Sequence, residues 1–179
     1  MNILSHDNFF IQGINALVGE HYARYFVNPL LKNGDVDVIS FIGMTSEQIK
    51  LFLLNNTFQR KVAVFASERQ FRLVHNIRFC DVLYFIDSKV SSDIFIEEIK
   101  MRRGEFDNSR ERIKLTPSEH EVISFLRKGL TVFFIASFLK KSPKTIYTLK
   151  KKVMTKMGVS SDIELFTKMY LVERFNKYY

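Results

Sequence analysis

The chain has 179 residues, of which 46% are hydrophobic, so it can bury one large or two small cores and is not a disordered polymer. Its formal charge of +8 lies mainly in residues 105–179, with 15 Lys+Arg against 8 Asp+Glu, whereas residues 1–104 carry 12 against 11. This surplus favours a polyanionic partner, with nucleic acid ahead of a membrane surface. One cysteine excludes an intramolecular disulfide, and neither a signal peptide nor a membrane-spanning apolar run is visible, so we expect a cytoplasmic protein.

The N-terminal part alternates apolar runs with amphipathic segments. The pattern predicts strands at residues 2–4, 36–42, 61–66 and 81–86, and helices at residues 9–18, 46–54 and 92–103. Strands that alternate with helices over about 100 residues favour a parallel sheet flanked by helices, an α/β architecture.

The almost entirely polar stretch 104–114 marks a boundary. It predicts an α/β domain at residues 1–104, a linker at residues 105–114 and a second domain at residues 115–179.

The second domain is expected to be all-α. Thr116–Glu119 is a capping box that opens a first helix, and Gly129 ends it. Thr131 caps a second helix that runs to about Leu139. Ser142, followed by Pro143, starts a third helix that Gly158 stops, and Ser161 with Glu164 forms a capping box for a fourth. Four short helices with tight connections and a basic third helix predict a helix-turn-helix domain.

The third helix carries most of the charge. Residues 140–156 contain seven lysines and no acidic residue. One face of this predicted helix is apolar and carries Ile146, Leu149, Val153 and Met157. The other face carries most of the hydroxyl and lysine side chains, which are Lys144, Tyr147, Thr148, Lys151, Lys152 and Thr155. Such a helix suits the major groove of DNA, although from this helix alone a solvated basic face is an equal alternative.

The order of these signals resembles the LuxR-type helix-turn-helix of bacterial transcription regulators. The matching pieces run in family order over about 45 residues: Leu115-Thr116-Pro117, Glu119, Glu121-Val122, Gly129-Leu130-Thr131, Ile135-Ala136, Leu139, Ser142, Lys144-Thr145-Ile146 and Lys156-Met157-Gly158-Val159. The resemblance implies DNA binding.

The resemblance also implies roles for single residues. Tyr147, Thr148 and Lys151 match the positions that face base edges. The residues expected to contact phosphates are Lys144, Thr145, Lys152 and Lys156 on the helix, with Lys140 and Lys141 at the turn. Where the family usually has polar residues, this chain has Val132–Phe134, which we expect to pack in the local core; contact with the N-terminal domain or a partner remains an alternative.

The N-terminal part resembles a response-regulator receiver domain that has lost its phosphorylation chemistry. Ser5 and His6 occupy the places of the paired carboxylates that hold Mg²⁺. Phe41 or Ile42 stands where the phosphoacceptor aspartate belongs, and Ile86 replaces the lysine after the last strand. Asp7 and Asp87 alone do not make a site, which indicates a degenerate pseudo-receiver.

The sequence offers no nucleotide-binding glycine motif and no metal-ligand spacing, so we expect no enzyme, no cofactor and no metal. The resemblance implies a transcription regulator, more often an activator, that binds double-stranded promoter DNA as a dimer and acts on RNA polymerase. The amphipathic C-terminal helix, Asp162–Asn176, is a candidate dimer contact. The alternative is an auxiliary protein that binds DNA only as a heterodimer with another response regulator.

Overall fold

A computed structural model of the protein describes residues 3–24, 36–59, 61–80, 82–89, 91 and 113–176. The chain divides into two compact units. The first holds a parallel sheet with its helices, and the second holds the C-terminal helices together with the segment Arg72–Ile77. None of the helices in the described part of the chain is long and apolar enough to cross a membrane.

The first unit is built on a four-stranded sheet in the order β1-β2-β3-β4, with every neighbouring pair parallel. Its strands are β1 (Ile3–Leu4), β2 (Val36–Ser40), β3 (Lys61–Ala66) and β4 (Val82–Asp87). Strand β3 is the most deeply placed, because all of its residues after Lys61 are buried. A continuous apolar run is typical of a parallel strand that is covered on both faces.

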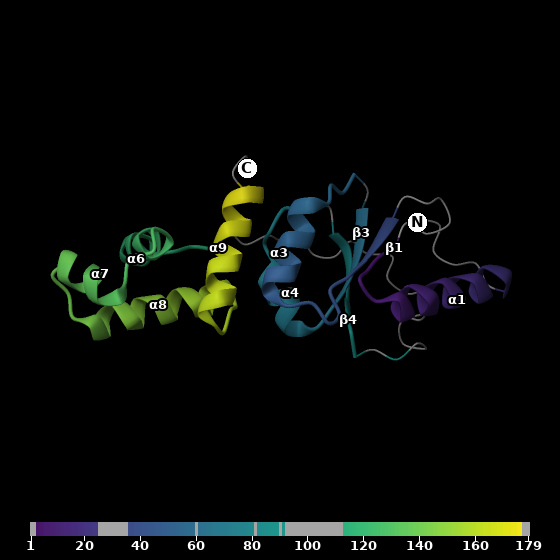
Figure 1. Ribbon diagram of the computed structural model, residues 1–179, viewed down its shortest axis with the longest axis horizontal. Helices are drawn as coiled ribbons and strands as arrows, with labels where there is room; N and C mark the ends of the chain where they lie inside the picture. The colour runs from purple at the N-terminus through teal and green to yellow at the C-terminus, as the bar shows by residue number, and fades with distance from the viewer. Residues whose placement is uncertain are drawn as a thin grey trace. The chain divides into compact units, whose positions relative to one another are not determined.

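Helices lie on both faces of this sheet (Figure 1). They are α1 (Asn8–Arg24), α3 (Ser46–Asn55) and α4 (Glu68–Val74). The Phe10 ring of α1 packs edge-on against Phe65 of β3, with ring centroids 4.9 Å apart. The ring centroids of Phe71 in α4 and Phe85 in β4 are 4.0 Å apart. Phe85 pairs with Val64, and Val64 points to the face of the sheet opposite to that of its neighbour Phe65. Helix α4 therefore covers the face opposite to α1. The α/β architecture predicted from the sequence is thereby confirmed.

Helix α4 was not predicted, although its capping box is readable in the sequence. Ser67 Oγ accepts from the Gln70 backbone N–H, and Gln70 Oε1 accepts from the Ser67 N–H at 2.9 Å. The same reciprocal pattern between Thr45 and Gln48 opens α3. The helix predicted at residues 92–103 and the linker predicted at residues 105–114 fall outside the described residues, except for Ile113 and Lys114.

The second unit contains four helices in its described C-terminal part: α6 (Pro117–Arg127), α7 (Val132–Phe138), α8 (Pro143–Met157) and α9 (Asp162–Asn176). Their predicted starts are confirmed, because Thr116, Thr131 and Ser142 each cap the helix that follows. Ser161 and Glu164 form the predicted capping box of α9. Each helix contributes at least one fully buried side chain to the shared core, among them Val122, Ile135, Ile146 and Leu165.

A buried lysine links α9 to the end of α8. Lys168 is 2% exposed, and its ammonium donates to the Met157 carbonyl oxygen at 2.6 Å. That carbonyl belongs to the last turn of α8, where intrahelical donors are lacking. Burial lowers the pKa of Lys168 to about 8.

Helices α6, α7 and α8 each end with a residue in the left-handed conformation. Gly129 follows α6 and Gly158 follows α8, as predicted. After α7 the same position is taken by Lys140, with φ of 50°. The Lys141 N–H donates to the Ala136 carbonyl at 2.9 Å, so this end has the hydrogen bonding of a glycine cap without the glycine.

We therefore expect Lys140→Gly to raise the free energy of unfolding of this unit by up to about 1 kcal/mol, because a side chain in this conformation is strained. Gly129→Ala should lower it by about the same amount. Chemical denaturation of both variants measures the two changes. Equal effects of the same sign would contradict the assignment of strain to Lys140.

Candidate nucleic-acid interface

Helix α8 has one buried side and one exposed side. Ile146 and Val153 are fully buried, Met157 is 7% exposed, and Leu149 is half-buried. The opposite side faces away from the helices that α8 packs on, α6 and α7 (Figure 1). All its polar members are exposed: Lys144, Thr145, Tyr147, Thr148, Lys151, Lys152, Thr155 and Lys156.

A stripe runs along the middle of this exposed side. Lys144, Thr148, Lys151 and Thr155 follow one another at spacings of four, three and four, so they lie above each other on successive turns. The Thr148 hydroxyl donates to the Lys144 carbonyl at 2.9 Å, and the Thr155 hydroxyl donates to the Lys151 carbonyl at 3.1 Å. Each hydroxyl oxygen keeps acceptor capacity, and a threonine methyl suits contact with a thymine methyl.

Thr155 was not among the residues predicted to bind DNA, although the sequence contains the signal for it. It lies four residues after Lys151 and shares the exposed side with the predicted residues. Of these, Tyr147 is 51% exposed. The Thr145 hydroxyl lies 2.9 Å from the Ser142 hydroxyl, so it belongs to the cap of α8.

Ion pairing divides the lysines of α8 into two groups. The Lys150 ammonium lies 2.6 Å from the Asp162 carboxylate, and the Lys156 ammonium lies 2.6 Å from the Glu119 carboxylate. Within the described residues, no acidic partner is found for Lys144, Lys151 or Lys152. Their charges therefore remain available to an external anion.

The Lys156 ammonium is held in place by its neighbours. Besides Glu119, it donates to the Lys114 carbonyl at 3.1 Å. Glu119 is 2% exposed, and its carboxylate also accepts from the Thr116 N–H at 2.8 Å. The hydrogen bond from Lys156, followed by that from Thr116, lowers the pKa of Glu119. This geometry gives Lys156 a structural contact between α8 and the start of α6.

The ion pair between Lys156 and Glu119 predicts that the stability of the helical unit depends on pH. Because the pKa of Glu119 is lower in the folded state than its ordinary value of 4.5, the carboxylate stabilises the fold above that value. The stabilisation is lost as the pH falls through the folded pKa. We expect Glu119→Gln to lower Tm at pH 7, and to make Tm less sensitive to acidification below pH 4.5 than in the unsubstituted protein.

Thermal unfolding between pH 7 and acidic pH measures this difference. Glu121→Gln, at an exposed position of the same helix, is the matched control and should leave the pH profile unchanged. Parallel profiles for Glu119→Gln and the unsubstituted protein would show that the pair does not contribute to acid sensitivity.

The expectation that Val132–Phe134 packs in the local core was correct only for Val132. Val132 is 8% exposed, whereas Phe133 is 68% and Phe134 is 54% exposed. The reason is geometric, because α7 is seven residues long and buries the positions i, i+3 and i+4, which are Val132, Ile135 and Ala136. The two phenylalanines follow Val132 directly and therefore face outward.

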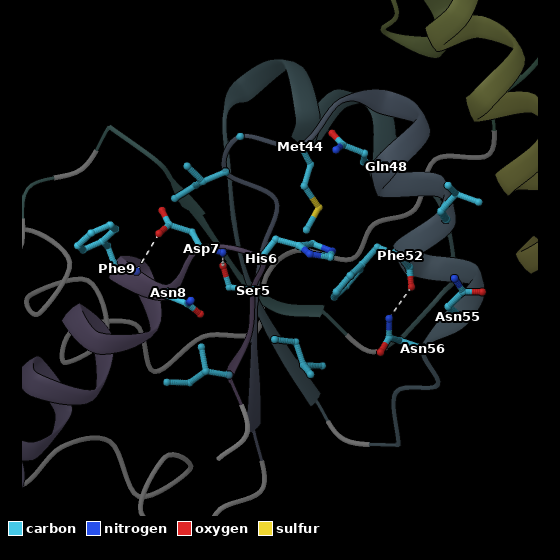
Figure 2. Close-up of a pocket in the computed structure, with 15 residues that line it drawn as sticks. Ser5, His6, Asp7, Asn8, Phe9, Met44, Gln48, Phe52, Asn55 and Asn56 are labelled. Atoms are coloured by element: carbon cyan, nitrogen blue, oxygen red, sulfur yellow. Dashed lines mark hydrogen bonds between the residues drawn. The ribbon is translucent and has the colours of Figure 1, made fainter.

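The first unit, called the receiver-like unit below, has an open groove of about 1020 Å³ beside the carboxyl ends of β1 and β2. Figure 2 shows Ser5, His6 and Asp7 in the wall formed by the loop after β1, and Met44, Gln48 and Phe52 in the opposite wall. Asp7 Oδ1 accepts from the Phe9 N–H at 2.9 Å, and the Asp7 N–H donates to Ser5 Oγ at 3.0 Å. The Asp7 carboxylate is thus a helix cap for α1.

The other positions of a receiver's reaction site are also filled by groups with structural contacts. Phe41, directly after β2, is fully buried and packs edge-on against Phe52, with ring centroids 5.9 Å apart. Ile86 in β4 is 2% exposed. Asp87 Oδ1 accepts from the Lys89 N–H at 2.9 Å. In the described part of the chain, no three His, Cys, Asp or Glu residues are grouped so that they could hold a metal ion.

Comparison with known proteins agrees with the geometry of the helical unit. Residues 114–169 match the family described as GerE, bacterial regulatory proteins of the luxR family. This segment is a luxR-family helix-turn-helix domain. It spans α6 to α8 and about half of α9, so the residues of the exposed side of α8 all lie within it.

Curated relatives share this domain and are named as transcription regulators. The chain is 41% identical over 56 residues to the transcriptional regulatory protein UhpA of Escherichia coli K12. It is 45% identical over 51 residues to the transcriptional activator protein BglJ, and 44% identical over 52 residues to RcsB, both of the same organism. The matches cover 31%, 28% and 29% of this chain, and only 29%, 23% and 24% of these relatives.

Solved structures of RcsB share the fold over nearly the whole chain. A two-component response regulator RcsB–DNA complex matches with a TM-score of 0.63 at 19% identity, and covers 95% of this chain and 96% of that one. RcsB of Salmonella enterica serovar Typhimurium bound to a promoter matches with a TM-score of 0.63 at 17% identity, and covers 95% and 97%. The predicted fold, a receiver-like unit followed by a helix-turn-helix domain, is confirmed.

Proposed function

We propose that the protein is a sequence-specific transcription regulator that inserts α8 into the major groove of double-stranded promoter DNA. The observation that carries this proposal is the exposed stripe Lys144, Thr148, Lys151 and Thr155 within a luxR-family domain. Lys151 and Thr148, with the neighbouring Tyr147, supply contacts to base edges. In this proposal such a regulator works in the cytoplasm and has no catalytic role.

The lysines that flank the stripe position the domain on the DNA backbone. Lys144, Lys152, Lys140 and Lys141 provide contacts to phosphates, which carry no sequence information. Lys156 contributes mainly through its pair with Glu119, so its role in DNA binding is indirect. This division of roles separates affinity from specificity and can be tested residue by residue.

Dimerisation is proposed to use the outer side of α9. Ile163, Phe166 and Tyr170 are 62%, 42% and 48% exposed and follow one another at spacings of three and four. Met169, on the same helix, is 4% exposed and belongs to the core. An apolar stripe with this spacing suits a second helix, and a two-fold dimer would place two α8 helices about one DNA turn apart.

Phosphorylation of the receiver-like unit is not part of the proposed mechanism. The side chains of Asp7 and Asp87 accept hydrogen bonds from nearby backbone N–H groups. The resemblance puts a phosphoacceptor at Phe41 or Ile42, neither of which has a carboxylate, and Phe41 is fully buried. In this proposal the unit serves as a platform for protein contacts, through which a DNA-bound dimer acts on RNA polymerase, as an activator.

Selection of bound fragments from random DNA tests this function, with the purified protein alone at about 0.15 M salt. An enriched palindrome with half-sites about one helical turn apart is the expected result. Weak, strongly salt-sensitive binding without a motif would contradict a self-sufficient homodimer.

The second candidate is an auxiliary regulator that binds specific DNA only as a heterodimer. The same exposed stripe on α9 favours it, because Ile163, Phe166 and Tyr170 can pair with the equivalent helix of another regulator. Sedimentation of the purified protein separates the candidates: a monomer at micromolar concentration supports the heterodimer, and a dimer supports the homodimer.

A further inference from the structure

Helix α7 presents an exposed aromatic patch made of Phe133, Phe134 and Phe138, which are 68%, 54% and 63% exposed. The rings of Phe134 and Phe138 are nearly parallel, with centroids 6.5 Å apart. Phe138 also stands edge-on against the half-buried Phe125 of α6, with centroids 5.2 Å apart. Phe125 of α6 thus packs against the patch and helps to hold its rings in place. Exposed apolar side chains that are grouped in this way often mark interaction sites.

The surroundings of the aromatic patch are positively charged. From residue 122 to residue 161 the chain has nine Lys+Arg and no Asp or Glu. The Lys128 ammonium lies 5.9 Å from the centre of the Phe125 ring, and Lys140, two residues after Phe138, is exposed. Among the described residues, neither lysine has an acidic partner. A partner that covers the rings thus meets a cationic rim.

The positive charge around the aromatic patch indicates which kind of molecule can bind there. Two copies of the patch facing each other would bring like charges together, which is destabilising. DNA would satisfy the lysines, but it offers its phosphates rather than an apolar surface to three phenyl rings. An acidic protein segment with one apolar side satisfies both requirements.

We propose that the aromatic patch docks an amphipathic helix of another protein, with apolar side chains over Phe133, Phe134 and Phe138 and with Asp or Glu side chains beside Lys128. A helix is the fitting shape because Phe134 and Phe138 are four residues apart and form a line along α7. The apolar residues of a partner helix repeat at the same spacing. This surface is separate from the DNA-binding stripe of α8, so the inference goes beyond the proposed function.

Two synthetic helical peptides of about 18 residues test the inference with the full chain at about 0.15 M salt. Both carry the same leucine side; one has glutamate on its polar side and the other has lysine at the same places. Fluorescence anisotropy of labelled peptides measures binding. We expect the glutamate peptide to bind at least about tenfold more tightly than the lysine peptide.

The double variant Phe133→Gln, Phe134→Gln should lose at least about tenfold in affinity for the glutamate peptide. Both positions are exposed, so the variant should unfold at the same temperature as the unsubstituted protein. Phe9→Gln is the matched control, because Phe9 is 85% exposed and lies in the other unit. It should bind the peptide unchanged.

Four results would overturn the inference. Equal binding of the two peptides would reduce the patch to a non-specific apolar surface, and unchanged peptide binding by the double variant would place the peptide elsewhere. A double variant that loses affinity for DNA would assign the rings to the DNA interface. A double variant that loses self-association would assign them to a second copy of this chain.

Discussion

Lys151→Ala is expected to weaken binding to the preferred DNA sequence by about 1–3 kcal/mol, which is roughly 5- to 150-fold in Kd. Lys151 is exposed in the middle of the stripe on α8, and no acidic partner is found for it within the described residues. If its ammonium donates to a guanine in the major groove, substitution removes discrimination at that base pair. Binding to unrelated sequences should change much less, so the selected motif should lose information at one position of each half-site.

Lys152→Ala is the informative comparison, since Lys152 is exposed toward the side of the stripe. A lost phosphate contact should weaken all sequences alike and reduce the slope of log Kd against log salt by about 1. Lys150→Ala is the matched control, because the Lys150 ammonium is paired with Asp162 and its side chain is only 13% exposed. The control should leave both specificity and salt dependence unchanged.

Titrations of each variant with the selected site and with a scrambled site, at three salt concentrations, distinguish these roles. If Lys151→Ala and Lys152→Ala lost affinity evenly across sequences, the assignment of the base-reading face would be wrong. A large effect of Lys150→Ala would show that its ion pair opens when DNA binds.

Ile146→Ala should lower the free energy of unfolding of the helical unit by about 2–5 kcal/mol. Ile146 is fully buried on α8, in a core to which Val122, Ile135 and Leu165 of the other helices contribute. Truncation removes buried apolar surface and leaves a cavity that neighbouring helices cannot fill without moving. Ile146→Val, which removes one methylene group, should cost about 0.5–1.5 kcal/mol and keeps the measurement possible if the alanine variant unfolds.

Tyr147→Ala provides the contrast at the next position of the same helix. Its ring is 51% exposed, so we expect little change in the unfolding transition and a weakened preference among DNA sequences. Denaturant titration together with DNA binding measures both quantities. Similar losses of stability in the two variants would contradict the orientation of α8.

The beginnings and ends of the helices in the helical unit follow from local sequence signals. Capping is local chemistry, since Thr116, Thr131 and Ser142 each satisfy backbone N–H groups within three residues. The same local signal, at Ser67 and Gln70, marks the start of α4, a helix that apolar periodicity alone does not predict. Apolar periodicity likewise predicted the buried side of α8 and the strands of the parallel sheet, because these depend on the spacing of residues along one element.

Which charges and aromatic rings remain on the surface depends on how the helices pack together. Lys150, Lys151 and Lys156 are the same residue type within two turns of one helix, yet Lys150 pairs with Asp162 and Lys156 with Glu119, 37 residues away in the chain. Phe133 and Phe134 looked like core residues, but the side of α7 that packs inward was already filled by Val132, Ile135 and Ala136. Ion pairs and exposure depend on contacts between elements, and these contacts are fixed by how the helices pack rather than by the spacing within any one of them.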